Sequence, residues 1–187
     1  MHKIAAFLAD GFEEVEALAV VDLCRRAGIE VDLVSIMGRQ KVIGAHHIGV
    51  DADILMEDLN FQAYDMLFLP GGQPGTRNLE ACELLKNQIT LFYKKGKQLA
   101  AICAAPTILA HMGLLKGKEA CCYPSLEGEL TAGGAVVTKQ PITRSGQIFT
   151  SRGLGTAIDL GLALVEALQG EDVAKQLAES VVYRQNG

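Results

Sequence analysis

Short apolar runs alternate with amphipathic stretches along most of this chain. Four runs are largely apolar and bounded by polar or turn residues, which is typical of buried strands: residues 3–9 (KIAAFLA), 30–36 (EVDLVSI), 64–72 (YDMLFLPGG) and 98–103 (QLAAIC). Apolar residues at helical spacing predict helices over residues 13–27, 80–95, 104–113, 155–168 and 172–182. Gly28 and Gly113 end two of these stretches, as glycines at helix C termini do.

The remaining segments predict short β-structure. Residues 41–50 alternate loosely around Gly44 and predict a hairpin, and residues 135–138 and 147–151 resemble short strands. Apolar strands that alternate with helices predict an α/β fold, in which helices cover both faces of a mostly parallel sheet. No linker or charge block divides residues 1–187, so we expect a single domain.

Composition and charge narrow the classes of protein. The chain is 49% hydrophobic and carries a net charge of −5, which disfavours nucleic acid or an acidic membrane as its partner. The apolar run at residues 4–9 is too short for a signal peptide, and no apolar segment approaches the ~18 residues of a membrane span. Five cysteines without paired spacing argue against a disulfide framework. We therefore expect a cytoplasmic protein.

Three strand ends are candidates for a common site. Ligands of parallel α/β sheets bind beyond the carboxyl ends of the strands. In this chain those ends carry Asp10 with Gly11, the Pro70-Gly71-Gly72 turn, and Cys103. We expect the three to lie close together.

Cys103 lies where a predicted strand passes into a predicted helix. The dipole and free N–H groups of a helix start favour a thiolate and lower a cysteine pKa from about 8.5. The small residues Ala104 and Ala105 permit the tight turn of a nucleophile elbow. The other cysteines have no such position, and we expect structural roles for them: Cys24, Cys82, Cys121 and Cys122.

No histidine can be assigned as the base of Cys103. His111 lies about 12 Å farther along the same predicted helix, and His2 precedes the first strand, at the other end of the sheet. His46 and His47 would face opposite sides of a regular strand, so they make a poor metal pair, although one of them could reach a site across a subunit boundary. We expect neither a metal nor a cofactor.

Two carboxylates follow the first predicted strand. The helical spacing turns Glu14 toward solvent and Glu16 toward the interior. Two interpretations of Glu16 remain open: a buried, protonated carboxyl that donates a hydrogen bond to a thiolate, or an exposed glutamate that complements the helix dipole. The role of Gly71 and Gly72 is also open, because two glycines after a strand can form an oxyanion site or simply a turn.

Taken together, five segments resemble the ThiJ/PfpI superfamily, and within it the branch of the parkinsonism-associated protein deglycase (DJ-one) and bacterial ThiJ-like proteins. The segments are GFEEVEA, DLCRRAGI, DMLFLPGG, LAAICAAP and TSRGLGTAIDLGLALVEAL, in the family's order and over nearly the whole chain. The resemblance implies a flavodoxin-like three-layer sandwich, related to class I glutamine amidotransferases, that forms a homodimer.

The resemblance also implies roles for single residues. Cys103 matches the family's reactive, easily oxidised cysteine, and Glu16 matches its protonated hydrogen-bond partner. Gly71, Gly72 and Ala104 match positions whose backbone amides line an anion pocket. Arg26 and Arg152 match as well, with structural or dimer-interface roles.

The chain departs from the family at two positions near the cysteine. A His-Pro pair of the deglycase branch is Tyr123-Pro124 here, and the histidine that follows the cysteine in the proteolytic PfpI type is Ala104. A tyrosine with a pKa near 10 is a poor base at neutral pH. Oxidation of the thiol needs no such base.

These features leave competing functions. The first is a cofactor-independent glyoxalase or deglycase that acts on a small aldehyde or a glycated substrate, with Cys103, Glu16 and Tyr123 as catalytic residues. The alternative is a non-catalytic redox sensor or chaperone whose cysteine is oxidised to a sulfinate. Thiamine-precursor metabolism ranks lower because no thiazole or phosphate site is evident. Protease and amidotransferase chemistry would need a histidine near Cys103, and the sequence places none there.

Overall fold

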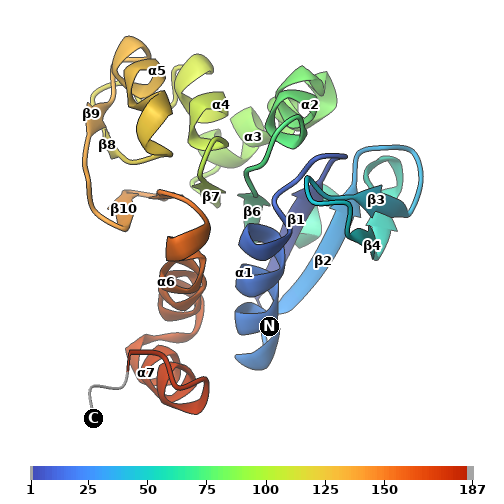
Figure 1. Cartoon of the computed structure of the whole chain (residues 1–187), viewed down its shortest axis with the longest axis vertical. Coiled ribbons are helices and arrows are strands. Elements are labelled where there is room, and N and C mark those ends of the chain that lie inside the picture. The colour runs from blue at the N-terminus through green and yellow to red at the C-terminus, as the bar shows by residue number, and fades with distance from the viewer. Residues whose placement is uncertain (1, 185–187) are drawn as a thin grey trace.

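The computed structural model describes residues 2–184 and has a seven-stranded sheet at its centre (Figure 1). The strand order is β10-β11-β7-β6-β1-β2-β5. The strands are β1 (Lys3–Leu8), β2 (Glu30–Ser35), β5 (Ile54–Leu55), β6 (Met66–Leu69), β7 (Gln98–Ile102), β10 (Ile142–Ser145) and β11 (Ile148–Ser151). All neighbours are parallel except β10 and β11. The order of the central strands is that of flavodoxin-like folds, which confirms the predicted fold class.

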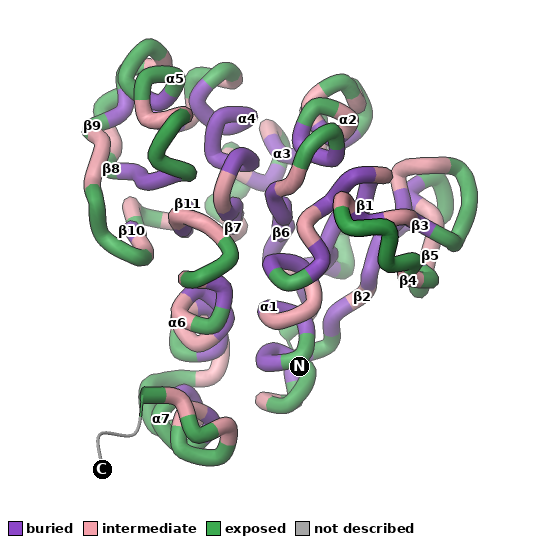
Figure 2. Tube along the Cα trace, viewed as in Figure 1, coloured by how far each residue is buried: buried purple, intermediate pink, exposed green. Residues whose placement is uncertain are grey.

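Helices cover both faces of this sheet and form two hydrophobic cores (Figure 2). One core contains residues of α1 (Glu14–Arg26), α6 (Ala157–Gln169) and α7 (Glu171–Ser180). The other contains residues of α2 (Gly75–Ala81), α3 (Glu83–Lys94), α4 (Pro106–His111) and α5 (Glu127–Ala132). Along β1, Ala6 and Leu8 enter the first core while Ala5 and Phe7 enter the second, because successive side chains of a strand point to opposite faces.

Two small sheets and four short 3₁₀ helices complete the described structure. Strands β3 (Lys41–Ile43) and β4 (Gly49–Asp51) form the predicted hairpin, and β8 (Glu119–Ala120) pairs with β9 (Val136–Val137). The 3₁₀ helices are η1 (Met56–Asp58), η2 (Phe61–Ala63), η3 (Pro124–Leu126) and η4 (Leu154–Thr156).

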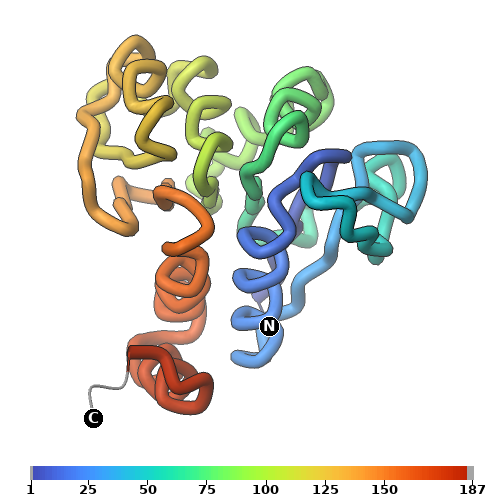
Figure 3. The backbone as a smooth tube through the Cα atoms, in the orientation of Figure 1, coloured from blue at the N-terminus to red at the C-terminus, as the bar shows by residue number. Residues whose placement is uncertain are grey.

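The helices α1 and α6 run side by side, as the backbone trace shows (Figure 3). A glycine permits this approach: a Cβ atom on Gly161 of α6 would lie 2.6 Å from Leu23 Cδ1 of α1. Within residues 2–184 no helix combines the length and apolar character needed to cross a membrane.

The structure differs from the sequence-based expectation in its shorter elements. The helix predicted over residues 80–95 begins at Glu83 as α3, and residues 80–81 end the separate helix α2, because Cys82 between them has an extended backbone (φ −81°, ψ 98°). Most of α2, helix α5 and strands β5 and β10 were not predicted. Helix α5 has six residues and buries only Leu130, so it leaves no periodic signal in the sequence.

Candidate active site

Cys103 occupies a sharp turn between β7 and α4. Its φ of 64° is a left-handed conformation that non-glycine residues adopt at a cost of about 1–3 kcal/mol. Hydrogen bonds on both sides hold the turn: the Cys103 amide donates to Ser151 O at 2.9 Å, and Cys103 O accepts from the Tyr123 amide at 2.8 Å. This is the geometry of a nucleophile elbow, in which a turn between strand and helix presents the side chain.

Glu16 lies beside this thiol in the interior, with 1% of its surface exposed. Its Oε2 accepts a hydrogen bond from the Gly71 amide at 3.0 Å, and its carboxyl is also hydrogen-bonded to the Cys103 side chain. Burial, together with the negative charge of Glu13, raises the pKa of Glu16 to about 7. The interior orientation predicted from the helical spacing is confirmed.

The thiol itself does not have the lowered pKa that we expected from a helix start. Burial, reinforced by the adjacent Glu16 carboxylate, raises the pKa of Cys103 to about 12, although the amides of Ala104 and Gly72 favour the thiolate. Helix α4 has only six residues and begins at Pro106, beyond the turn, so its dipole does not outweigh the burial.

Cys103 and Glu16 therefore titrate as a pair. Burial raises the pKa of both groups, and the Glu16 carboxylate raises that of the thiol further, so the pair resists the loss of both protons. With one negative charge and one proton on the pair, the hydrogen bond between the two groups can exchange that proton. The thiolate form is reached when the proton lies on Glu16.

Two glycines allow these groups to approach each other. A Cβ atom on Gly71 would lie 2.5 Å from Glu16 Oε2 and 2.6 Å from Cys103 Cβ. Gly72 has a φ of 93°, and a Cβ atom there would lie 2.6 Å from Gly11 O. The strand ends after β1, β6 and β7 thus converge, as their parallel order predicts. The Gly71 amide is directed to Glu16, whereas the amides of Gly72 and Ala104 reach the thiol.

Asp10, at the same edge, has a structural role. Its Oδ1 accepts a hydrogen bond from the Ile43 amide at 3.0 Å, and its carboxylate forms an ion pair with Arg39. These contacts tie the end of β1 to the β3–β4 hairpin.

The thiol opens into a pocket with a cavity volume of about 350 Å³. Its lining residues are Gly72, Gln73, Arg77, Cys103, Ala104, Tyr123, Ser125 and Leu126. Tyr123 is half exposed, with 50% of its surface accessible. None of the described residues that line the pocket is a histidine. The pocket therefore contains the Tyr123 hydroxyl but no imidazole base.

The prediction that Glu14 faces solvent is wrong. Glu14 is 3% exposed, because the β3–β4 hairpin covers the start of α1. Its carboxylate accepts hydrogen bonds from the amides of His46 at 2.8 Å and Ile48 at 3.4 Å, and lies 3.0 Å from His46 Nδ1. Burial alone would raise the pKa of Glu14, but these hydrogen bonds hold it below its ordinary value. The hydrogen bond to the Glu14 carboxylate, with the charges of Glu13 and Glu14, raises the pKa of His46.

One group of side chains within residues 2–184 has metal-ligand spacing. Glu13, Glu14 and His46 offer ligand atoms within 4.8 Å of one another. In the structure these groups contact one another: His46 Nδ1 lies 3.0 Å from the Glu14 carboxylate and 3.5 Å from that of Glu13. His47 takes no part in it.

The other cysteines are free thiols away from the pocket. Cys24, Cys121 and Cys122 are fully buried, and burial raises their pKa values. Cys82 Sγ is 3.9 Å from Met56 Sδ, in a partly buried contact. These positions agree with the structural roles expected from the sequence.

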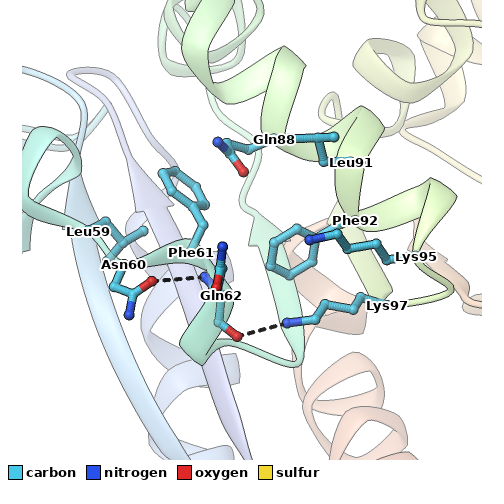
Figure 4. Close-up of a pocket in the computed structure, with 9 residues that line it drawn as sticks. All are labelled: Leu59, Asn60, Phe61, Gln62, Gln88, Leu91, Phe92, Lys95 and Lys97. Carbon is cyan, nitrogen blue, oxygen red and sulfur yellow. Dashed lines mark hydrogen bonds between the residues drawn. The ribbon is translucent and has the colours of Figure 1, made fainter.

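A second cavity of about 280 Å³ lies between η2 and α3 (Figure 4). The rings of Phe61 and Phe92 line it, and Lys97 Nζ donates to Gln62 O at 3.1 Å beside it. It lies next to the segments that enter β6 and β7, whereas Cys103 follows the opposite end of β7. This cavity therefore belongs to a different part of the molecule from the thiol.

Comparison with known proteins finds relatives that match most of the chain. The model of the DJ-1/PfpI family matches residues 2–167. Protein DJ-1 homolog A of Arabidopsis thaliana is 36% identical over 180 residues, which cover 96% of this chain. The chain spans 46% of that relative's length. "Glutathione-independent glyoxalase DJR-1.2" of Caenorhabditis elegans is 31% identical and is matched over 88% of this chain and 87% of its own.

Solved structures show the same fold. One described as "Toxoplasma gondii DJ-1, oxidized" superimposes with a TM-score of 0.93 at 32% identity. The match covers 98% of this chain and 100% of that one.

Proposed function

The chain belongs to the DJ-1/PfpI family, and from this premise we propose that it is a cofactor-independent glyoxalase or deglycase with Cys103 as its nucleophile. The observation that carries the proposal is the buried Glu16 carboxyl, hydrogen-bonded to the Cys103 thiol, with a pKa near 7. A proton donor and acceptor poised at neutral pH beside a nucleophile suits general acid–base catalysis. The glyoxalase name of the Caenorhabditis elegans relative supports this reaction class.

In the first step, the Cys103 thiolate adds to the aldehyde carbon of methylglyoxal and forms a carbon–sulfur bond. The carbonyl oxygen takes up the proton that Glu16 holds, which gives a hemithioacetal and a Glu16 carboxylate. The amides of Gly72 and Ala104, which already stabilise negative charge at the thiol, lie beside the reacting atoms.

In the second step, the Glu16 carboxylate removes the proton from the former aldehyde carbon and returns it to the neighbouring carbon. The proton of the hemithioacetal hydroxyl passes to the neighbouring oxygen, which gives a lactoyl thioester. Water then cleaves the thioester, releases lactate and returns the thiol. The Glu16 carboxyl lies beside the thiol to which the substrate would be bonded: a Cβ atom placed on Gly153 would lie 3.8 Å from Glu16 Oε1 and 3.9 Å from Cys103 Sγ. Tyr123, at the pocket mouth, can donate a hydrogen bond to the substrate.

Lactate production from methylglyoxal by the purified protein tests the proposal. We expect Cys103→Ser to abolish turnover and Cys82→Ser, which removes a thiol outside the pocket, to retain it. Activity that survives Cys103→Ser would refute the mechanism. An inactive parent protein together with an active Tyr123→His variant would show an intact pocket that lacks a proton relay.

A redox sensor is the second candidate, and the lack of a histidine in the described pocket favours it. One equivalent of peroxide would convert the thiolate to a sulfenate and release water, and a second would give a sulfinate. The Glu16 carboxyl and the amides of Gly72 and Ala104 could hold the added oxygens. The description of the Toxoplasma relative as oxidised supports this chemistry. Mass spectrometry after peroxide treatment should find two added oxygen atoms on Cys103, and earlier oxidation of Cys121 or Cys24 would contradict it.

We further propose a cytoplasmic homodimer. Large apolar side chains are exposed on elements around α1 and α6, including Val15 (47%), Ile48 (55%) and Ile158 (39%). Burying such side chains between two copies would stabilise a dimer. Arg26, which pairs with Asp22 at 2.7 Å, lines a surface hollow between α1 and α6. Arg152 pairs with Glu127 at 3.2 Å and has a structural role. Sedimentation of the parent protein and of Ile158→Asp would test this assembly.

A further inference from the structure

A smaller, more polar chamber adjoins the Cys103 pocket. The chamber has a cavity volume of about 140 Å³ and lies between α2, α4 and the η3–α5 segment. Gln73, Arg77 and Leu126 line both spaces. Thr76, Glu80, Thr107 and Glu129 line the chamber alone. Arg77 therefore lies in the wall that the two spaces share.

Thr76 leaves a buried hydroxyl unsatisfied in this chamber. The residue is 2% exposed, and its Oγ1 has no hydrogen-bond partner among the described residues. The neighbouring Thr107 differs, because its hydroxyl donates to Ala104 O at 2.8 Å. A buried hydroxyl without a partner costs about 1–3 kcal/mol, and a bound polar group would recover that cost.

Arg77 is a cation without an acceptor among residues 2–184. It has no ion pair or hydrogen bond there. The two carboxylates of the chamber share one histidine as their partner: His111 Nδ1 lies 2.6 Å from Glu80 Oε1, and His111 Nε2 lies 3.2 Å from Glu129 Oε2. Apart from Glu16, which is hydrogen-bonded to the thiol, no described aspartate or glutamate lines the Cys103 pocket. Among the described residues that line the two spaces, Arg77 is the one cation and Thr76 carries the buried hydroxyl without a partner.

We propose that Arg77 and Thr76 form a subsite for a carboxylate, so that the preferred substrate is an α-oxo aldehyde with a carboxylate on its tail. This inference rests on the proposed function of the same site. A guanidinium matches the planar geometry of a carboxylate and donates two parallel hydrogen bonds to it. The reaction balances as for methylglyoxal: 4,5-dioxopentanoate takes up one water and becomes 2-hydroxyglutarate.

The first experiment compares kcat/KM for 4,5-dioxopentanoate and methylglyoxal. We expect Arg77→Gln to lower the ratio of the two values about tenfold, because it removes one charge-assisted interaction from a partly solvated site. Thr76→Val, which replaces the hydroxyl with a methyl group of similar size, should lower the ratio about threefold. Arg144→Gln removes the same charge from β10 and should leave the ratio unchanged. An unchanged ratio in Arg77→Gln would overturn the proposal.

The second experiment does not depend on turnover. Iodoacetate and iodoacetamide both alkylate Cys103 by displacement of iodide from carbon, but only iodoacetate is an anion. We expect Arg77→Gln to reduce the rate with iodoacetate at least threefold relative to iodoacetamide, with Arg144→Gln as the control, and the difference to shrink at high salt. Equal ratios in the parent and Arg77→Gln would refute the subsite. If neither aldehyde is turned over by the parent, the glyoxalase function fails and the alkylation ratio alone decides the subsite.

Discussion

Gly71→Ala should strongly disturb the proposed active site through a single added methyl group. Gly71 does not have a positive φ, so an alanine is not excluded by the backbone. The added Cβ would instead lie 2.5 Å from Glu16 Oε2, 2.6 Å from Cys103 Cβ and 3.0 Å from Ile102 O. Ordinary contacts begin near 3.4 Å, so Glu16 and Cys103 must each move about 1 Å away from Gly71.

The size of the effect follows from this geometry. Glu16 cannot retreat freely, because it is buried and its Oε2 is bonded to the Gly71 amide itself. Overpacking of such a site typically costs about 1–3 kcal/mol. For a domain of this size that corresponds to a decrease in Tm of roughly 3–10 °C. Displacement of reacting groups by about 1 Å can reduce turnover about 100-fold.

Calorimetry and the methylglyoxal assay measure the two consequences separately. Gly128→Ala is the matched control, because a Cβ atom there meets nothing within 4 Å and Gly128 lies in helix α5. It should raise the free energy of unfolding by about 0.5–1 kcal/mol and leave turnover unchanged. A Gly71→Ala protein with the parent's Tm and kcat would show that the packing of Gly71 between Glu16 and Cys103 does not constrain the site.

Three further predictions concern substitutions of Glu16, Glu14 and Tyr123. Glu16 has a folded pKa of about 7, above its ordinary 4.5, so its contribution to the free energy of unfolding is complete below pH 4.5 and is lost as the pH rises to 7. That loss, roughly 3 kcal/mol, should disappear in Glu16→Gln when urea unfolding is compared at pH 5 and pH 8. Glu14 has a lowered pKa, so its contribution to the free energy of unfolding is present above pH 4.5 and is lost in acid. Glu14→Gln should therefore lower the free energy of unfolding, measured with urea, by about 1–3 kcal/mol at pH 7 and by less at pH 3. Tyr123→His should raise kcat for lactate formation, because an imidazole with a pKa near 6.5 exchanges protons at neutral pH, whereas Tyr123→Phe should change kcat less than about threefold.

The sheet could be predicted from sequence because its strands are buried on both faces. The segments of β1, β6 and β7 are apolar almost throughout, and alternation with periodic helices leaves little choice of architecture. Short elements could not be predicted in this way. Strand β10 (ITRS) pairs at the edge of the sheet and is only partly buried, so its composition resembles that of a loop.

The position of Cys103 at a strand-to-helix turn was also predictable, but its electrostatic environment was not. The strand-to-helix junction identified Cys103, and the convergence of parallel strand ends placed Gly72 beside it. A helix start suggested a lowered thiol pKa, yet the pKa is raised. Burial decides that outcome, and burial depends on segments far away in the sequence, such as the one that brings Gly153 within reach of the thiol. Arg77 and Thr76 gave no signal, because their free hydrogen-bonding groups become evident only once the chamber is assembled.

Glu14 and Glu16 show most directly where prediction from sequence ends. Both lie in the first turn of α1 and both are buried, yet their pKa values shift in opposite directions. The helix determines only where each side chain points; the segments that cover it determine its charge. Glu14 meets the hairpin, where two backbone amides and the His46 ring stabilise a carboxylate, and it ties the hairpin to α1. Glu16 meets a thiol and the negative charge of Glu13, with the Gly71 amide as one of its few donors, and so keeps a proton that it can release near neutral pH. The same turn of helix thus carries a fixed negative charge on Glu14 and an exchangeable proton on Glu16.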